Sequence, residues 1–420
     1  MQDVDVAVIG AGAAGVGAGL ALAQSGLSYV ILEAANRIGG RAYTDRVSMP
    51  FHWDQGCHWL HCADVNPLVA WADKLGARYL SPEEDGDFYH SWFDGRWADA
   101  EERRVVGAEI DGAFTALYAA AGSAGDVAIS EILPETTTRN PRVRLILQLM
   151  ASEDPERVSA SGYCDYHDTE ANWPVTSGYG DLIERMARGL NIRTGHSVSR
   201  VDDDGNWVRL ATKNGDLRAR AVIITVSTNV LASGAIAVNA RDARPVLDAV
   251  EGFPCGSYEK VCLSLRRPVP GLENALFFEI EPDGKPPVSF QVSSWNENML
   301  IGHVGGSIAR ELAEAGAQTL EAFVRERVAT AFGSGFEAEI EQVATTGWQC
   351  NPLVLGAYSA CRPGYAQIRR DAISAHTGRV AFAGEAFSLG SQATAHGAYQ
   401  SGQDVAKRLI SEEFAGGASG

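Results

Sequence analysis

The stretch that decides the fold is Val4-Asp5-Val6-Ala7-Val8-Ile9-Gly10-Ala11-Gly12-Ala13-Ala14-Gly15, close to the start of a chain of 420 residues. Residues 4–9 are mostly apolar and β-branched, which predicts a buried parallel strand. A glycine turn follows at once, and the small, apolar segment 13–24 predicts a helix that lies close to a sheet. Residues 29–32 predict a second strand, with Glu33 at its carboxyl end.

This order of strand, glycine turn, helix, strand and acid is the fingerprint of a dinucleotide-binding fold. The turn positions are Gly10, Gly12, Ala14 and Gly15. They would bring backbone N–H groups and a helix N-terminus up to a pyrophosphate. Glu33 would accept hydrogen bonds from the ribose hydroxyls. The alternative is an ordinary βαβ unit whose glycines serve only tight packing.

The residues after Glu33 indicate which dinucleotide is bound. The segment 33–41 reads Glu33-Ala34-Ala35-Asn36-Arg37-Ile38-Gly39-Gly40-Arg41. A second glycine turn and a cation would meet the pyrophosphate from its other side, which a flavoprotein needs and a nicotinamide dehydrogenase does not. The segment resembles the ExxxRxGGR motif of the flavin amine oxidase superfamily, which binds FAD. The alternative for Arg37 and Arg41 is that they are solvated surface charges.

Bulk properties limit the class of protein. The length and a composition that is 45% hydrophobic and 21% charged suit two globular domains. No apolar run is long enough to span a membrane, and the fold begins within four residues, so we expect no signal peptide and a cytoplasmic enzyme. The net charge of −18 argues against nucleic acid as a partner. Seven scattered cysteines argue against a disulfide framework, and the oligomeric state stays open, with a homodimer as one alternative.

We expect an α/β fold with a Rossmann-like FAD-binding domain, built from discontinuous segments, and an inserted α+β substrate domain. The FAD-binding domain takes residues 1–75, 175–245 and 370–413; the substrate domain takes 76–174 and 246–369, and 414–420 form a flexible tail. In the first domain we predict helices at 179–190 and 397–410 and strands at 192–194, 197–201, 207–212, 216–219, 221–226 and 380–385. In the second we predict a hairpin at 89–97 turned at Asp94-Gly95, helices across 101–149, strands at 260–265 and 276–280, and a helix at 307–330.

Further segments extend the resemblance along most of the chain. Residues 51–61 are similar to the segment of polyamine oxidases that reads GAxWIHG and crosses beside the flavin, and Asn66-Pro67 stands where an Asn-Pro follows it. Residues 393–402 resemble the ATxHGAxxSG segment of polyamine oxidases and histone lysine demethylases. The resemblance implies a set of cofactor-binding residues: Gly10, Gly12, Ala14, Gly15, Glu33, Ala34, Arg37, Gly39, Gly40, Arg41, Gly56, Cys57, His58, Trp59, Val198, Trp348, Gly384, Glu385, Thr394 and Ala395.

The same resemblance implies catalytic roles for Lys260, Tyr358 and His61. Lys260 would hold a water against flavin N5 and assist the reaction with oxygen; the alternative is a lysine reaching out from a strand end. Tyr358, in a segment similar to W…P…GxYS, would form one wall of the substrate site, and the alternative is a core tyrosine. His61 would bind substrate or carry a proton near neutral pH, unless it only packs near the flavin.

Two positions depart from the monoamine oxidase pattern. Ala357 replaces the cysteine that bonds covalently to FAD, so we expect non-covalent FAD. Thr394 replaces the second cage tyrosine and would be a substrate-binding residue, so the site is closer to polyamine oxidases and demethylases. The implied activity is oxidation of a primary or secondary amine by hydride transfer to flavin N5, with imine hydrolysis and reduction of O2 to H2O2.

Other classes stay open at this stage. A flavin desaturase or dehydrogenase of the phytoene desaturase or protoporphyrinogen oxidase type shares the first forty residues. A non-catalytic binder, like the Rab escort chaperones, would keep the fold without flavin chemistry. The cluster His52, Cys57, His58, His61 and Cys62 fits no standard zinc spacing, so we expect no metal. The polar group Asp165 to Glu170 would either hold a distal ammonium or be a solvated linker.

Overall fold

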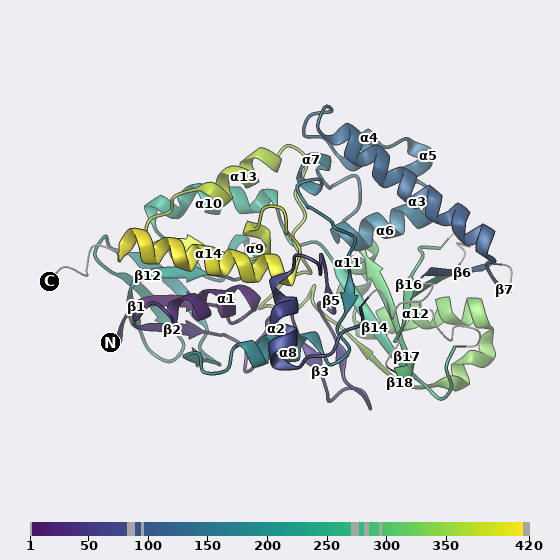
Figure 1. Cartoon of the computed structure of the whole chain (residues 1–420), viewed down its shortest axis with the longest axis horizontal. Coiled ribbons are helices and arrows are strands. Elements are labelled where there is room, and N and C mark those ends of the chain that lie inside the picture. The colour runs from purple at the N-terminus through teal and green to yellow at the C-terminus, as the bar shows by residue number, and fades with distance from the viewer. Residues whose placement is uncertain are drawn as a thin grey trace.

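The computed structural model describes residues 2–81, 89–93, 96–269, 277–280, 285–293 and 296–414. Within these ranges two large sheets lie toward opposite ends of an elongated molecule (Figure 1). One sheet contains both the first and the last strand of the chain. The other is built from the middle of the chain. The predicted α/β class is confirmed.

The first sheet is centred on β1 (Gln2–Ile9). This strand runs parallel to β2 (Tyr29–Leu32) on one side and to β12 (Leu217–Ile224) on the other. The strand order is β13-β10-β11-β12-β1-β2-β9, and β19 also pairs with β12. The remaining strands of this sheet are β9 (Ile192–Arg193), β10 (Val198–Asp203), β11 (Val208–Thr212), β13 (Ala237–Asn239) and β19 (Val380–Phe382).

Helices cover both faces of this sheet because side chains alternate along its strands. On one face, α1 (Ala13–Leu22) and α14 (Ala395–Glu413) lie side by side (Figure 1). A Cβ at Gly402 would lie 1.9 Å from the carbonyl oxygen of Ala14, so the glycine permits this close approach. The other face packs against α10 (Arg244–Ala249) and α13 (Ala366–Ser374). The glycine turn after β1 is therefore held between fixed elements.

The second sheet has the order β18-β14-β17-β16-β15-β6-β7. Its central strand β14 (Tyr258–Leu265) pairs antiparallel with β17 (Asn296–Gly305) and β18 (Ile340–Thr345). Helices α11 (Gly306–Ala315) and α12 (Ala317–Phe332) pack their apolar faces on it. The other strands are β6 (Tyr89–Phe93), β7 (Arg96–Trp97), β15 (Phe277–Ile280) and β16 (Ser289–Ser293).

Short strands and helices connect the two sheets. The longest of these helices are α3 (Ala100–Ala121) and α6 (Pro141–Ala151), which share an apolar core. Among the described helices, none has both the length and the apolar composition to cross a bilayer. The other elements are β3 (Thr44–Asp45), β4 (Trp53–Asp54), β5 (Trp59–Leu60), α2 (Pro67–Leu75), α4 (Ile129–Ile132), α5 (Glu135–Thr138), α7 (Ala160–Tyr163), β8 (Trp173–Pro174), α8 (Tyr179–Met186) and α9 (Thr228–Ala232).

Several predicted elements differ from the structure. The helix predicted at 307–330 is two helices, because Gly316 adopts a φ of +107° between α11 and α12. The strands predicted at 216–219 and 221–226 are the single strand β12. The helix predicted at 179–190 ends at Met186. The turn at Asp94-Gly95 and the tail from residue 415 lie outside the described residues.

The domain boundaries stay a prediction. Strands from all three segments assigned to the FAD-binding domain do share the first sheet. Among the described residues, two pairings cross predicted boundaries: β5 in the first domain pairs antiparallel with β8 in the segment 76–174, and an antiparallel bridge joins Tyr79 to Val175. We therefore expect those boundaries to behave as packed junctions rather than as flexible linkers.

Candidate active site

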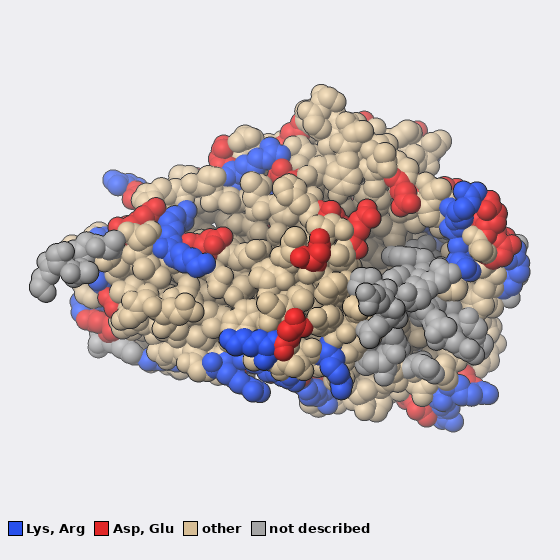
Figure 2. Space-filling view, in the orientation of Figure 1, with Lys and Arg blue, Asp and Glu red and all other residues tan. Residues whose placement is uncertain are grey.

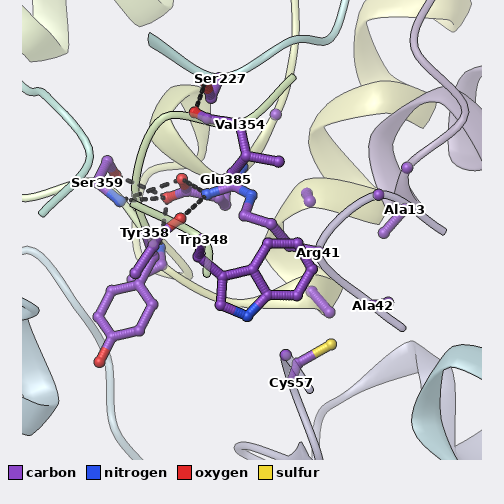
Figure 3. Close-up of a pocket in the computed structure, with 18 of the residues that line it drawn as sticks. Ala13, Arg41, Ala42, Cys57, Ser227, Trp348, Val354, Tyr358, Ser359 and Glu385 are labelled. Carbon is purple, nitrogen blue, oxygen red and sulfur yellow. Dashed lines mark hydrogen bonds and ion pairs between the residues drawn. The ribbon is translucent and has the colours of Figure 1, made fainter. Parts of the chain in front are cut away.

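A cavity of about 890 Å³ reaches from the glycine turn after β1 to the second sheet. Its wall includes residues of the turn 9–14, the segment 33–42, the segment 55–61, helix α6, strand β14 and the segments 348–361 and 384–398. This volume falls in the range of about 300–1,000 Å³ that is usual for ligand and cofactor sites. Figure 3 shows Arg41, Trp348 and Tyr358 reaching into it from different parts of the chain.

Two glycine turns form one end of the cavity. An isolated bridge joins Gly12 to Gly39, and Gly39 N–H donates to the carbonyl of Ala11 at 2.9 Å. At Gly12 a Cβ would lie 3.8 Å from the nearest protein atom, the carbonyl oxygen of Gly39, which is an ordinary contact, so the protein itself does not require a glycine there. Gly15 differs, since a Cβ there would lie 1.9 Å from the carbonyl oxygen of Gly10. The turns form a cradle of backbone atoms at the N-terminus of α1, which fits a pyrophosphate.

Glu33 is fixed at the end of β2, inside the same wall. Its two carboxylate oxygens accept hydrogen bonds from the N–H groups of Ala11 and Ala35, each at 2.7 Å. The side chain is almost fully buried and lines the cavity. A carboxylate has about four acceptor positions, so two backbone contacts leave capacity for ribose hydroxyls. Val198, predicted as a cofactor-binding residue, lines the same cavity.

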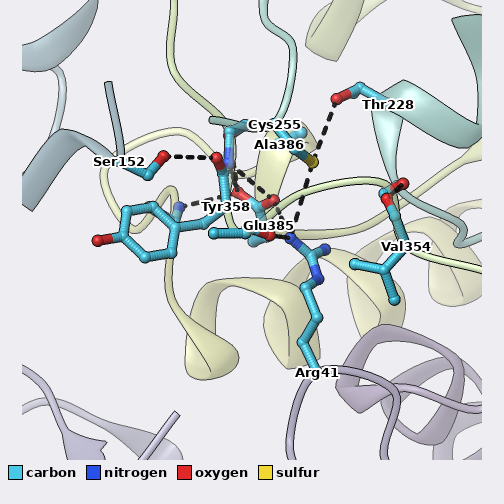
Figure 4. A network of polar contacts seen from close by, with 12 residues as sticks. Arg41, Ser152, Thr228, Cys255, Val354, Tyr358, Glu385 and Ala386 are labelled. Carbon is cyan, nitrogen blue, oxygen red and sulfur yellow. Dashed lines mark hydrogen bonds and ion pairs between the residues drawn. The ribbon is translucent and has the colours of Figure 1, made fainter. Parts of the chain in front are cut away.

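Arg41 and Arg37 are not loose surface charges. Arg41 forms an ion pair with Glu385 at 2.8 Å (Figures 3 and 4). Arg37 donates to the carbonyl of Gly40 at 2.8 Å, and its guanidinium lies 4.1 Å from the centre of the Tyr43 ring. Both side chains line the cavity. Each therefore contributes positive charge to the wall while it holds the second glycine turn in shape.

Glu385 joins three separate segments. Besides Arg41, its carboxylate accepts hydrogen bonds from the hydroxyl and N–H of Ser359 (Figure 3). It also accepts one from the N–H of Ala393. Burial would raise the pKa of this carboxyl, but the Arg41 charge and these hydrogen bonds outweigh it and lower the pKa. Glu385 thus stays ionised and anchors the segment that carries Tyr358.

Lys260 enters the cavity wall from β14. Its Nζ lies 2.9 Å from the carbonyl oxygen of Asp54, 2.6 Å from that of Gly56 and 3.0 Å from Nδ1 of His58. The side chain is almost fully buried. Burial lowers the pKa of Lys260 to about 8, against a counteracting attraction from Asp54. The amine is therefore able to exchange a proton close to neutral pH.

The wall beside Lys260 is a group of aromatic and imidazole rings. His303 lies opposite Lys260 across the β14–β17 pair and stacks on His58, with ring centres 5.6 Å apart. Its Nδ1 lies 2.7 Å from the hydroxyl of Tyr258, whose ring centre is 5.9 Å from that of Tyr358. Burial lowers the pKa of His303 well below its ordinary value, so the ring is neutral.

The predicted substrate residues line the far part of the cavity. The hydroxyl of Tyr358 donates to the carbonyl of Leu149 in α6. The ring of His61 lies 2.6 Å from the side-chain oxygen of Asn172. Burial lowers the pKa of His61, so the expected change of charge near neutral pH is not supported by its surroundings. Thr394 caps α14, where its hydroxyl accepts from the N–H of Gly397 at 3.0 Å.

The structure brings together nearly all of the predicted site residues. Gly15 alone among them is missing from the described cavity wall, because it packs against Gly10 instead. Trp348 lines the cavity and donates from its indole nitrogen to the carbonyl of Gln55 at 3.0 Å. Their roles toward a cofactor or substrate stay predictions.

Sequence reasoning missed Tyr258, His303 and Asn172. The apolar run 299–304 around His303 is a strand signal that would have placed it in β17, next to the predicted strand of Lys260. No local pattern marks Asn172. Asp165, predicted as part of an ammonium-binding group, is engaged by Arg370 at 2.8 Å, whereas Glu170 is exposed and lines the cavity. No group of three metal-binding side chains occurs among the described residues.

Comparisons with known proteins agree with this geometry. Polyamine oxidase 2 of Arabidopsis thaliana is 24% identical over 432 residues, which cover 94% of this chain and 86% of that protein. Lysine-specific histone demethylase 2 of Homo sapiens is 26% identical over 442 residues, or 96% of this chain and 53% of that protein.

A solved structure of putrescine oxidase bound to putrescine superposes with a TM-score of 0.80 at 19% identity, over 98% of this chain and 100% of that chain, which shows the shared fold. The model of the family described as flavin containing amine oxidoreductase matches residues 13–162 and 145–410. Because this match spans most of the chain, the protein belongs to the flavin-containing amine oxidoreductase family, whose FAD fits the two glycine turns and Glu33.

Proposed function

We propose that this protein oxidises a primary or secondary amine of the polyamine or monoamine type and uses O2 as the electron acceptor, so that H2O2 is released. The observation that carries the proposal is the single cavity that joins the glycine turns to Lys260 and to the ring wall of Tyr358 and Tyr258. Relatives named polyamine oxidases, which match along 94% of the chain, support the amine as the substrate.

The cavity suits an amine that binds without its extra proton. When bound, FAD supplies the acceptor for a hydride from the carbon next to the amine nitrogen. Lys260 repels a substrate ammonium at neutral pH, and neutral His61 does not compensate for that charge. Tyr358 and Tyr258 provide apolar ring surface that excludes water around the substrate carbon.

The N-terminus of α14 opens on the cavity at Thr394 and Ala395. The positive end of this helix dipole favours negative charge on whatever lies against it. The N-terminus of α14 would therefore stabilise the negative charge that reduction adds to a bound flavin. This agrees with the mostly uncharged first turn of the helix, which carries no acidic residue.

We propose that FAD is bound without a covalent bond. Ala357 lines the cavity where monoamine oxidases would present a cysteine. Cys57 also lines it, but burial raises the pKa of this thiol to about 12, so it is not a nucleophile at neutral pH. Denaturation in acid should release all of the flavin into the supernatant, and yellow colour retained in the protein pellet would contradict this.

For the substrate, we propose that Glu170 receives the distal ammonium of a diamine or polyamine. The other cavity carboxylates are engaged, Glu33 by two N–H groups and Glu385 by Arg41. Glu170 lies exposed at the cavity with a φ of +62°. The variant Glu170→Gln should raise the apparent Kd for spermidine about tenfold, a loss of one charge pair. The same variant should leave the apparent Kd for benzylamine unchanged. The control variant Glu314→Gln should leave the apparent Kd unchanged for both amines.

The first experiment is a visible spectrum of the purified protein, followed by anaerobic addition of spermidine, benzylamine and amino acids. A flavin spectrum that one amine bleaches, with peroxide formed when air is readmitted, would establish the proposed reaction. A flavin that no amine bleaches would favour the desaturase alternative. A colourless protein would favour a binding function. We also propose a cytoplasmic location, since all seven cysteines are free thiols.

On the face shown in Figure 2, acidic and basic side chains are interspersed over a broad uncharged surface. No long basic stripe crosses the middle of this face. Together with the net charge of −18, this supports a small molecule rather than nucleic acid as the partner.

A further inference from the structure

The Lys260 amine has two kinds of hydrogen-bond partner, backbone carbonyl oxygens and an imidazole nitrogen. Two of its three contacts, Asp54 and Gly56, are backbone carbonyl oxygens, which only accept hydrogen bonds. They hold two N–H bonds of Lys260 whether the amine is charged or neutral. The remaining position on Nζ faces Nδ1 of His58 at 3.0 Å. That position carries a proton in the ammonium form and a lone pair in the amine form.

His58 is able to form a hydrogen bond with both the charged and the neutral form of Lys260. A neutral imidazole has one N–H and one acceptor nitrogen, so Nδ1 accepts from charged Lys260 while Nε2 carries the proton. When Lys260 is neutral, Nδ1–H donates to it and Nε2 is free. The same contact therefore persists before and after a proton moves from Lys260 to His58. These three contacts use every N–H bond of charged Lys260, so a proton that leaves Lys260 for the cavity has to pass through His58.

The second ring nitrogen of His58, Nε2, is the end of this route that does not contact Lys260. Nε2 is buried and has no hydrogen-bond partner among the described residues, while His58 itself lines the cavity. A buried N–H normally has a partner. Since the neighbouring side chains supply none, the acceptor has to come from what occupies the cavity.

The surrounding charges keep His58 neutral. Burial lowers the pKa of His58 well below its ordinary value, Lys260 on β14, His303 on β17 and His61 add to that effect, and a hydrogen bond to the Gly56 backbone opposes it only in part. Asp54 and the thiols of Cys57 and Cys262 interact electrostatically with Lys260, and each of them favours the charged form of its amine. His58 therefore passes a proton without storing a second one.

We propose that His58 carries a proton between Lys260 and the cavity during the reaction with O2, a step that rests on the proposed function. Conversion of O2 to H2O2 requires two electrons and two protons; both electrons and one proton come from the reduced flavin. The second proton leaves His58 Nε2 for the oxygen, and a Lys260 Nζ–H bond breaks as the His58 Nδ1–H bond forms. Lys260 is left neutral, still bonded to two carbonyls, and regains its proton from solvent.

The kinetic test uses the holoenzyme reduced with dithionite and mixed with O2 in a stopped-flow instrument. His58→Asn keeps an acceptor near the Nδ1 position but passes no proton. It should slow reoxidation at least tenfold while anaerobic reduction by the amine changes less than threefold. The double variant with Lys260→Met should be no slower than Lys260→Met alone, because both residues act in one route. Losses that multiply would overturn the proposal.

A second readout needs no activity. Nitrogen-15 NMR of histidine-labelled apoprotein, assigned with His58→Asn, should show His58 neutral with its proton on Nε2, and Lys260→Met should convert it to a mixture of tautomers. If His58 kept the same tautomer in Lys260→Met, the proposed coupling between His58 and Lys260 would be overturned. The exposed His376 provides a matched control, since His376→Asn should behave as wild type in both experiments. Failure of the proposed function would appear instead in the wild type, as a flavin that no amine reduces.

Discussion

Arg41 and Glu385 are separated by 344 residues in the chain and by 2.8 Å in the structure. The pair joins the second glycine turn to the segment that precedes α14 (Figure 4), and Glu385 holds Ser359 in addition (Figure 3). Three parts of the chain that line the cavity thus depend on one buried carboxylate. This pair connects the second glycine turn with the segment that carries Tyr358.

Removing Arg41 should therefore destabilise the protein. The variant Arg41→Met leaves the Glu385 carboxylate buried without its counter-charge, and breaking such a pair costs about 3 kcal/mol. The measurements are thermal unfolding and the ratio of FAD to protein after purification. We expect a lower unfolding temperature and less bound FAD. The double variant with Glu385→Gln should recover part of the loss, and strictly additive losses would contradict the pairing.

The same ion pair should make the stability of the folded protein depend on pH in the acid range. The pKa of Glu385 is lower in the folded protein than its ordinary value of 4.5. The unfolded chain therefore binds more protons in this range, so the stabilisation is complete above pH 4.5 and is lost as the pH falls through the lower, folded value. Unfolding followed from pH 6 downward should show this loss in the wild type. Glu385→Gln should show a weaker dependence, and an identical profile would contradict the assignment.

Two glycines of the first turn should respond differently to alanine. At Gly12 the added Cβ meets no atom within 3.8 Å, whereas at Gly15 it lies 1.9 Å from a carbonyl oxygen. Gly12→Ala should leave the unfolding temperature of the apoprotein within a few degrees but weaken FAD binding at least tenfold. Gly15→Ala should lower both. Titration of apoprotein with FAD, together with thermal unfolding, separates the two cases, and equal FAD affinity in Gly12→Ala and wild type would place the pyrophosphate elsewhere.

Lys260 should act on reoxidation rather than on flavin reduction. Its pKa of about 8 means that the proton donor is lost as the pH rises through that value, so reoxidation by O2 should slow above pH 8. Lys260→Met should be slow at every pH and should lack this inflection. Stopped-flow measurement of both half-reactions checks the prediction. Equal losses in reduction and reoxidation would remove the role assigned to Lys260.

Tyr358 should contribute to flavin reduction by the amine through its aromatic ring rather than through its hydroxyl. Its hydroxyl donates to the carbonyl of Leu149, away from the Tyr258 ring that faces the same cavity. Tyr358→Phe should therefore change anaerobic reduction by less than about threefold, whereas Tyr358→Ala should slow it more than tenfold, since it leaves the substrate carbon unsupported. A large loss in Tyr358→Phe alone would instead assign the function to the hydroxyl.

The sequence by itself determined the cofactor end of this protein. The strand, glycine turn, helix and acid of residues 4–33 are local, because each constraint acts between neighbours in the chain. The same holds for the second turn at 39–40, whose glycines need no distant partner to be recognised. Short-range patterns of this kind also predicted most helices and strands, and failed where one glycine, Gly316, divides a continuous amphipathic pattern.

Only the tertiary structure decided how the other residues are used. The partners of Lys260 come from residues 54–58, about two hundred positions earlier, and His303 reaches it through strand pairing. Burial then lowers the pKa of the lysine and of both histidines, an effect that depends on the whole surrounding wall. Desolvation and contacts between distant segments have no local pattern, which is why the proton route through His58 becomes visible only in the folded chain.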